Sequence, residues 1–182
     1  MISIYIFVNI LNEASFYMDL ELKTVYLLLG SNLGDRKSII DEAISHIGSA
    51  IGEVISRSSF YETAAWGNED QPSFLNVAVG IETAMSAQEV LKNTLEIEEK
   101  LGRIRKEKWG ARLIDIDIIL YGEDIIDDGE RLTIPHPRMQ DRRFVLEPLA
   151  EIAGSAYHPV CNKNVSDILS ILKDNLVVSK IV

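Results

Sequence analysis

The stretch that decides the fold is residues 74–81, which reads FLNVAVGI. Large apolar residues recur at every second position, the period of a strand with one face in a core. One face would carry Leu75, Val77, Val79 and Ile81, and the other would carry Phe74, Asn76 and Ala78. The alternation therefore predicts a β-strand that presents an aromatic ring and an amide on the side opposite its aliphatic face.

Working outward, further elements are expected on both sides of this strand. Strands are predicted at Val25–Leu29, which runs into the turn Gly30–Gly34, at Val54–Tyr61, and at Asp115–Tyr121, with a loop at Glu62–Pro72. Helices are predicted from about Asp35, from a Ser86/Glu89 capping box to about Leu101, and at Val165–Leu172. Because strands and helices do not alternate strictly as βαβ units, the fold is expected to be α+β with a largely antiparallel sheet.

Composition restricts the class of protein. The 182 residues suit one domain, and 47% apolar with 25% charged residues is ordinary for a globular chain. The single cysteine, Cys161, has no internal disulfide partner, which favours a reducing cytoplasm. A net charge of −10 argues against nucleic-acid binding. We expect a monomer with no membrane span, although nothing in the sequence decides the oligomeric state.

The N-terminal residues need separate treatment. Met1–Leu11 is apolar but lacks a basic leading segment and a clear cleavage site, and it is too short to cross a bilayer. Met18 precedes the first convincing strand. We therefore expect residues 1–17 to be a start-site extension or a disposable tail, and residues 18–182 to form a single domain.

The best chemical signal is the pair Asp115 and Asp117 on a predicted strand. Residues two apart on a strand share a face, so Ile114, Ile116 and Ile118 would enter the core and both carboxylates would project from the other side. Two carboxylates held together are unfavourable unless a cation joins them, and Mg²⁺ commonly takes one or two carboxylates plus phosphate oxygens. An isolated pair of this kind is more commonly two solvated charges, so the neighbouring residues have to decide between a metal site and a solvated pair.

That neighbourhood is basic. Five cations fall within ten residues just before the aspartates: Arg103, Arg105, Lys106, Lys108 and Arg112. Gly102 and Gly110 bracket most of them, which predicts a loop that closes over phosphates, with Trp109 as a stacking or lid residue. A solvated basic loop is the competing interpretation. Cations beside a metal-type carboxylate pair favour a nucleotide.

Two other residues stand out. Glu98 falls on the apolar stripe expected from Ala87, Leu91, Leu95 and Leu101, so it needs a cationic partner unless the helix leaves the core there. His136 lies between two prolines and near Arg131, Arg138 and Arg142. An imidazole in such surroundings suits a phosphate better than a transition metal.

Four ordered blocks together resemble the 6-hydroxymethyl-7,8-dihydropterin pyrophosphokinase family of folate biosynthesis. They are LLLGSNLGDR, SSFYETAAWGNEDQPSFLNVAV, IEEKLGRIRKEKWGARLIDIDIILYG and RLTIPHPRMQDRRFVLEPLAEIA, spanning about Thr24 to Ala153. The resemblance implies a ferredoxin-like α+β fold and transfer of pyrophosphate from ATP to the pterin hydroxymethyl group, giving AMP. It also implies ATP as co-substrate and two Mg²⁺ ions.

The resemblance also assigns residues. The metal ligands would be Asp115 and Asp117, and Arg103 and Arg112 would act catalytically on the phosphates. The ATP positions would be Glu98, Arg105, Lys108, Trp109, Ile118, Arg131, Thr133, His136 and Arg142. The pterin positions would be Gly30, Thr63, Trp66, Phe74, Asn76 and Phe144. Offset stacking between two aromatic rings and an amide at the ring edge make physical sense of the pterin set.

The chain departs from the family pattern at Ala64, where a proline is often found, and at Lys108, where arginine is common. The loop is also one residue shorter than in some members. Altered loop kinetics are expected, because lysine lacks the bidentate fork of arginine. Two rival interpretations remain at this point: another metal-dependent nucleotidyl or phosphoryl transferase, and a noncatalytic RNA- or nucleotide-binding module, against which the acidic pI of about 4.8 speaks.

Overall fold

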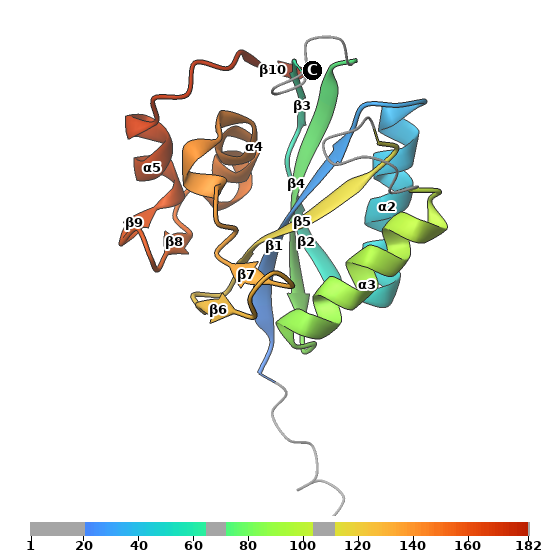
Figure 1. Ribbon diagram of the computed structural model, residues 1–182, viewed down its shortest axis with the longest axis horizontal. Helices are drawn as coiled ribbons and strands as arrows, with labels where there is room; N and C mark the ends of the chain where they lie inside the picture. The colour runs from blue at the N-terminus through green and yellow to red at the C-terminus, as the bar shows by residue number, and fades with distance from the viewer. Residues whose placement is uncertain (1–20, 65–71, 104–111, 182) are drawn as a thin grey trace, which may run out of the picture.

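The computed structural model describes residues 21–64, 72–103 and 112–181 (Figure 1). Its strands are β1 (Lys23–Ser31), β2 (Glu53–Arg57), β3 (Phe60–Thr63), β4 (Phe74–Thr83), β5 (Asp115–Tyr121), β6 (Ile126–Asp127), β7 (Thr133–Ile134), β8 (Tyr157–His158), β9 (Lys163–Asn164) and β10 (Val178–Ile181). Its helices are α2 (Arg36–Ala50), α3 (Ala87–Lys100), α4 (Arg143–Ala153) and α5 (Val165–Ile171), with a 3₁₀ turn at Met139–Asp141.

The main sheet has six strands, and every pairing in it is antiparallel. Its order is β10-β3-β4-β1-β5, with β2 also paired to β4. The alternating stretch at 74–81 became β4, the strand on which β1, β2 and β3 all pair. The predicted α+β class with a largely antiparallel sheet is confirmed.

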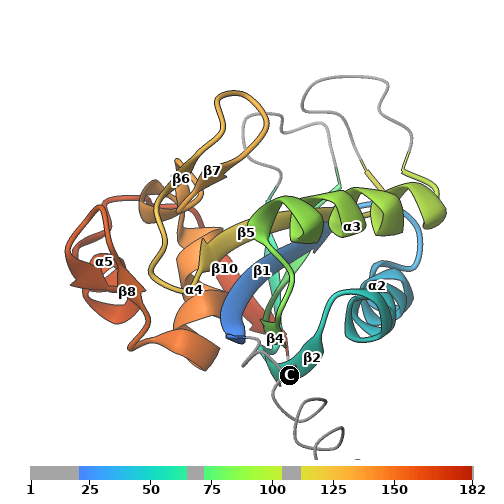
Figure 2. The same cartoon turned by 90° about the horizontal axis from the view of Figure 1, so that it is seen from below.

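Helices cover both faces of the sheet (Figure 2). Helices α2 and α3 lie on one face over an aliphatic core that includes Leu27, Leu29 and Val77. Helices α4 and α5 lie on the other face over a second core that includes Leu28 and Ala78. Adjacent residues of β1 thus enter different cores, because successive side chains of a strand point to opposite faces.

Local signals explain where the helices begin. Asp35 accepts a hydrogen bond from the backbone N–H of Ser38 (3.1 Å), so α2 begins at Arg36. The predicted capping box precedes α3, with Glu89 Oε2 accepting from the Ser86 N–H at 2.8 Å. Helix α4 has no side-chain cap on its own N-cap residue, Arg142.

Three expectations about elements need correction. The strand expected at Val54–Tyr61 is interrupted, because Ser58 bonds back to the Ala78 backbone and separates β2 from β3. The stripe of α3 runs through Val90, Thr94 and Ile97, while Leu95 is exposed. Helix α4 and strand β10 were not expected. The predicted boundary at residue 18 lies outside the described residues.

No helix within the described ranges is both long and apolar enough to cross a membrane.

Candidate active site

One transverse row of the sheet brings the chemical residues together. Asp115 of β5 pairs with Gly30 of β1, Gly30 pairs with Asn76 of β4, and Asn76 pairs with Tyr61 of β3. Directly paired residues of antiparallel strands project to the same face, and neighbouring strands lie about 4.8 Å apart. The acidic strand and the amide-bearing strand therefore share one face, separated only by a glycine.

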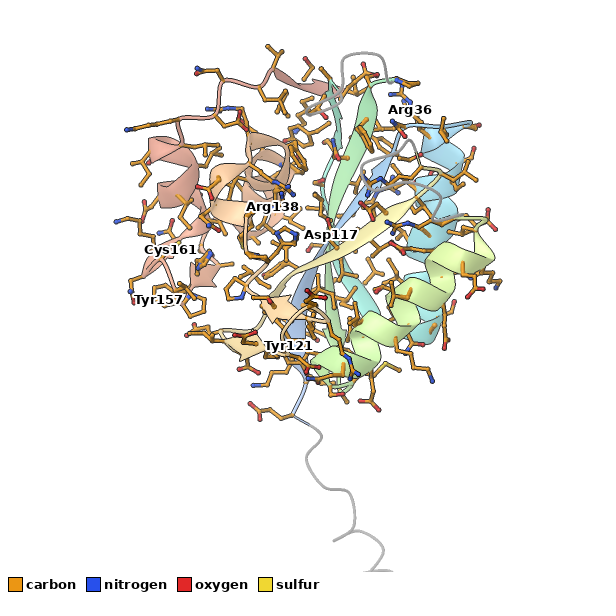
Figure 3. All side chains as sticks on the ribbon, in the orientation of Figure 1. Arg36, Asp117, Tyr121, Arg138, Tyr157 and Cys161 are labelled. Atoms are coloured by element: carbon orange, nitrogen blue, oxygen red, sulfur yellow. The ribbon has the colours of Figure 1, made fainter. Side chains whose placement is uncertain are left out.

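The aspartate pair has the predicted orientation. Ile114, Ile116 and Ile118 are buried in the core beneath α2 and α3, so Asp115 and Asp117 project from the opposite face. Figure 3 labels Asp117 near the middle of the molecule. The Ile118 side chain does not join the aspartates, so any contact it makes with a ligand on their face must use its backbone.

An alternating chain of charges holds Asp115. Arg103 Nη1 lies 2.6 Å from Asp115 Oδ1 and also pairs with Glu98, whose side chain is only 2% exposed. Arg112 Nη1 lies 2.5 Å from Asp115 Oδ2. Glu98 Oε1 also accepts from the Ile116 N–H (2.7 Å), which anchors α3 to β5. The predicted need of Glu98 for a cationic partner is confirmed, and the partner is Arg103.

The surroundings of Asp117 disfavour its ionised form. Its carboxylate is partly buried next to like charges, and the pKa of Asp117 is raised to about 7, first by desolvation and then by Asp115 and Glu98. Arg112 and Arg142 only partly offset this. A divalent cation would relieve the repulsion, so the donor chemistry fits Mg²⁺.

A neutral imidazole faces the same region. The pKa of His136 is lowered to about 4, first by desolvation and then by Arg142 and Arg138. Its Nδ1 accepts from the Arg138 N–H (3.3 Å), so in the neutral ring the hydrogen is on Nε2. His136 can therefore donate to a phosphate oxygen without carrying charge. Its backbone N–H is fixed to Ile119 O at 3.0 Å, which joins it to β5.

The other half of the face carries a buried amide, a buried hydroxyl and an aromatic ring. Thr63 and Asn76 are both 3% exposed, and Asn76 Nδ2 donates to Thr63 Oγ1 at 3.1 Å. A Cβ at Gly30 would lie 3.2 Å from Asn76 Oδ1 and 3.8 Å from the Phe74 ring, so glycine leaves the amide room. The Arg112 guanidinium lies 5.8 Å from the centre of the Phe74 ring, which connects the cationic and aromatic halves.

Phe144 comes from the facing helix. It lies in the first turn of α4, where the Arg142 guanidinium is 5.5 Å from its ring centre. Arg142 also interacts with Asp115 and Asp117. Thus α4 supplies one aromatic and one cationic group to the face on which β4 and β5 supply an aromatic ring and two carboxylates.

Two functional candidates were not singled out from the sequence, although both lie in the block LLLGSNLGDR. Asn32, which is 2% exposed, accepts from the Arg112 N–H at 2.8 Å and donates to Pro72 O at 3.3 Å. Arg36, labelled in Figure 3, donates to Glu62 Oε1 (2.8 Å) and to Ser73 O (2.9 Å). The signal available in the sequence was the polar turn itself, which directly follows the buried strand β1.

Of the remaining predicted site residues, two lie within the described part of the chain and four lie outside it. Thr133 lies partly buried on β7, and Arg131 is exposed in the turn before it. Arg105, Lys108, Trp109 and Trp66 lie outside the described residues. Across the described ranges, no cluster of three or more His, Cys, Asp or Glu side chains is arranged to hold a metal, so a cation here needs ligand oxygens as well.

Comparison with known proteins gives this geometry its context. The family model of 7,8-dihydro-6-hydroxymethylpterin-pyrophosphokinase (HPPK) matches residues 26–154. The chain belongs to the HPPK family. The predicted activity, pyrophosphoryl transfer to a hydroxymethyldihydropterin, is that of this family, and the sequence resemblance is confirmed.

Curated HPPK relatives cover most of the chain. The 2-amino-4-hydroxy-6-hydroxymethyldihydropteridine pyrophosphokinase of Methylorubrum extorquens is 46% identical over 70% of this chain and 81% of its own length. The Bacillus subtilis enzyme of the same name is 45% identical over 70% and 76%, and the Aquifex aeolicus enzyme 42% over 77% and 86%.

The fold is also that of solved HPPK structures. A crystal structure of a Plasmodium falciparum HPPK-DHPS triple mutant with pteroate has a TM-score of 0.67 at 17% identity. That match covers 82% of this chain and 43% of the larger protein. The predicted ferredoxin-like α+β fold is confirmed.

Proposed function

We propose that this HPPK-family chain uses Mg²⁺ and the residues named above to transfer pyrophosphate from ATP to 6-hydroxymethyl-7,8-dihydropterin. The hydroxymethyl oxygen attacks the β-phosphorus in line, and its proton passes to one of three candidate acceptors: Asp117, bound water or a phosphate oxygen. The new bond is pterin O–Pβ, and the bond that breaks joins Pβ to the oxygen bridging it to the α-phosphorus, so AMP leaves. The observation that carries this proposal is the shared face on which Asp115, Gly30 and Asn76 are paired across three strands.

The donor set supports a cation at the aspartates. Asp115 and Asp117 offer hard oxygen ligands, and the raised pKa of Asp117 reflects like charges that a cation would neutralise. Two carboxylates leave room for phosphate oxygens in an octahedral sphere, and two ions are proposed. When bound, Mg²⁺ would align ATP and acceptor and offset negative charge.

The cations of the chain then have distinct tasks. Arg103 and Arg112 are held next to Asp115, where their forks can exchange a carboxylate oxygen for phosphate oxygens. Neutral His136 donates its Nε2 hydrogen to a phosphate oxygen, and Arg142 approaches from α4. These donors stabilise the charge that spreads over the transferring group.

The aromatic half positions the acceptor. Phe74 and Phe144 would stack on the two faces of the pterin, and the buried Asn76 amide would bond its edge. Because positioning supplies most of the rate, no covalent enzyme intermediate forms. The proposed set also includes Trp66, Arg105, Lys108 and Trp109, together with Arg131, Thr133 and the backbone of Ile118.

We further propose that the chain acts as a cytoplasmic monomer that does not bind nucleic acid. The net charge of −10 and the lone, partly buried Cys161 support this.

Phosphorus NMR of a mixture of the chain, Mg²⁺, ATP and hydroxymethyl-dihydropterin tests the reaction. The expected products are AMP and a pterin diphosphate in equal amounts. Formation of ADP or inorganic phosphate in their place would contradict the proposal. A matched reaction with Asp117→Asn controls for contaminating kinases and should produce neither product.

A further inference from the structure

The segment after α5 runs past the start of α4 and ends as a strand of the main sheet. Residues 172–177 have no regular structure, and β10 then forms the sheet edge next to β3. In Figure 1 this red segment runs from α5 over α4 to β10. The HPPK family model ends at residue 154, so the match assigns nothing to this segment. We call residues 174–181 the C-terminal strap.

The strap supplies the cap that α4 lacks. Asp174 Oδ2 accepts from the Arg143 N–H at 2.8 Å, at the first residue of α4. The Arg143 side chain returns a bond from Nε to Asp174 O at 2.9 Å. A carboxylate at a helix N-terminus accepts a free N–H and lies favourably in the helix dipole. Asp174 thus fixes the turn of α4 that carries Arg142 and Phe144.

The strap also holds the opposite wall. In β10, Val178 pairs with Thr63 and Lys180 pairs with Tyr61, both in β3. Thr63 accepts the Asn76 amide hydrogen bond that orients the ring-edge group of the proposed pterin site. The strap therefore contacts β3, the strand next to the one that bears Phe74 and Asn76.

The carboxylate of Glu151 connects α4 to both β3 and β10. Glu151 accepts from the Tyr61 hydroxyl at 2.7 Å and from the Ser59 hydroxyl at 2.9 Å, and lies 3.2 Å from Lys180 Nζ. These bonds lower the pKa of Glu151 in spite of its desolvation, so the carboxylate stays charged near neutral pH. Helix α4, strand β3 and strand β10 are joined at this one side chain.

We infer that the C-terminal strap is a positioning element of the pterin site, which sets the distance between Phe144 on α4 and the Phe74–Asn76 wall on β4. Asp174 is its positioning residue. The inference rests on the proposed pterin site. The strap makes none of the described contacts with Asp115 or Arg103, and it reaches the nucleotide side only through Arg142, which is one of several proposed ATP residues. Its loss should therefore affect the pterin more than ATP.

The test compares Asp174→Ala with Asn175→Ala, an exposed neighbour in the same segment. The Asp174→Ala variant should raise the KM for the pterin about fivefold, because the first turn of α4 that carries Phe144 loses its cap, while the KM for ATP and kcat change less than about twofold. Amide exchange of residues 143–146 should also quicken. Asn175→Ala should leave all of these values unchanged.

Asp174→Asn keeps an oxygen acceptor without the charge and should fall between the wild type and Asp174→Ala. It also carries the test if Asp174→Ala does not fold. Equal pterin KM values for Asp174→Ala and Asn175→Ala, or equal losses for both substrates, would overturn the inference and leave the proposed function standing. A wild-type chain that yields no pterin diphosphate would overturn the proposed function and this inference together.

Discussion

Arg103 Nη1 lies 2.6 Å from Asp115 Oδ1. The same guanidinium pairs with Glu98, so one cation joins a buried glutamate of α3 to an acidic residue of β5. Arg112 occupies the second oxygen of Asp115. A residue proposed to bind metal is thus neutralised by the two arginines proposed to bind phosphate, and a metal–nucleotide complex can replace both pairings.

Two substitutions of Arg103 should distinguish the contribution of its positive charge to catalysis from that of its planar guanidinium group. Arg103→Lys keeps a positive charge beside Glu98 but loses the bidentate fork, so kcat should fall about 10²-fold with the fold intact. Arg103→Met should lower kcat further. It should also lower the free energy of unfolding by about 3 kcal/mol, because buried Glu98 loses its cation. Steady-state kinetics and urea unfolding measure the two effects. A fully active Arg103→Lys enzyme would contradict this role.

Asp117 gives a pH dependence with a definite sign. Its folded pKa of about 7 is higher than the roughly 3.9 of an unfolded aspartate, so the folded state binds the extra proton between these values. The free energy of unfolding of the metal-free protein should therefore decrease as pH rises from about 4 to about 7. Partial exposure of the carboxylate reduces the contribution to about 2 kcal/mol.

The Asp117→Asn variant removes that dependence. It should melt about 4–8 °C higher than the wild type at pH 8 in a chelator, and about equally at pH 4, while losing activity. Differential scanning calorimetry at both pH values makes the measurement. Asp128→Asn, at an exposed site, is the control and should change neither melting temperature nor activity. A less stable Asp117→Asn protein at pH 8 would contradict the electrostatic account.

Substitution of Gly30 should weaken binding of the pterin and leave binding of the nucleotide almost unchanged. The added methyl of Gly30→Ala would lie 3.2 Å from Asn76 Oδ1 and push the amide from its position. The KM for the pterin should rise roughly tenfold, equivalent to about 1.4 kcal/mol, with little change for ATP. Gly48→Ala is a matched control within α2, where the new methyl meets only Val54 at 3.6 Å and should stabilise the helix. An equal rise in both KM values would contradict the assignment of Gly30 to the pterin site.

Asn32 should affect both kcat and the pterin KM, because it bonds to the backbone of Arg112 on the phosphate side and of Pro72 on the pterin side. Asn32→Ala removes the acceptor for the Arg112 N–H and the donor to Pro72 O, so kcat should fall about tenfold through displaced Arg112. Asn32→Asp keeps the acceptor for the Arg112 N–H, loses the donor to Pro72 O and adds a negative charge. Its kcat should recover to within about threefold of the wild type, whereas loss of the bond to Pro72 O should raise the pterin KM in both variants. Pre-steady-state and steady-state kinetics separate these effects. Identical profiles for the two variants would exclude this division of tasks.

The parts of the fold that follow from short-range patterns could be predicted. The two-residue period of β5 placed Asp115 and Asp117 on one face, and the Ser86 box fixed the start of α3. Glu98 was recognised as a buried acid even though the stripe around it was misplaced, because Leu95 at the helix surface resembles a core residue in the sequence.

The parts that depend on distant partners could not be predicted. Helix α4 has no local cap and contains Pro148, and it is stabilised at its start by Asp174, 31 residues beyond Arg143. The short β10 has a mixed buried and exposed pattern that carries no strand period of its own. The two tasks of Asn32 reach residues 40 and 80 positions away, a relationship that only the folded chain displays.

The proposed mechanism depends most on Asp115 and Asp117, which would hold the cation that positions the nucleotide. Calorimetric titration with a nonhydrolysable ATP analogue, first in a chelator and then in saturating Mg²⁺, tests it most directly. Mg²⁺ should increase the affinity of the wild type for the analogue at least about tenfold, a change of about 1.4 kcal/mol, and should have no such effect on Asp115→Ala or Asp117→Ala. Affinity independent of Mg²⁺ in the wild type, or the same Mg²⁺ dependence in both variants, would contradict it.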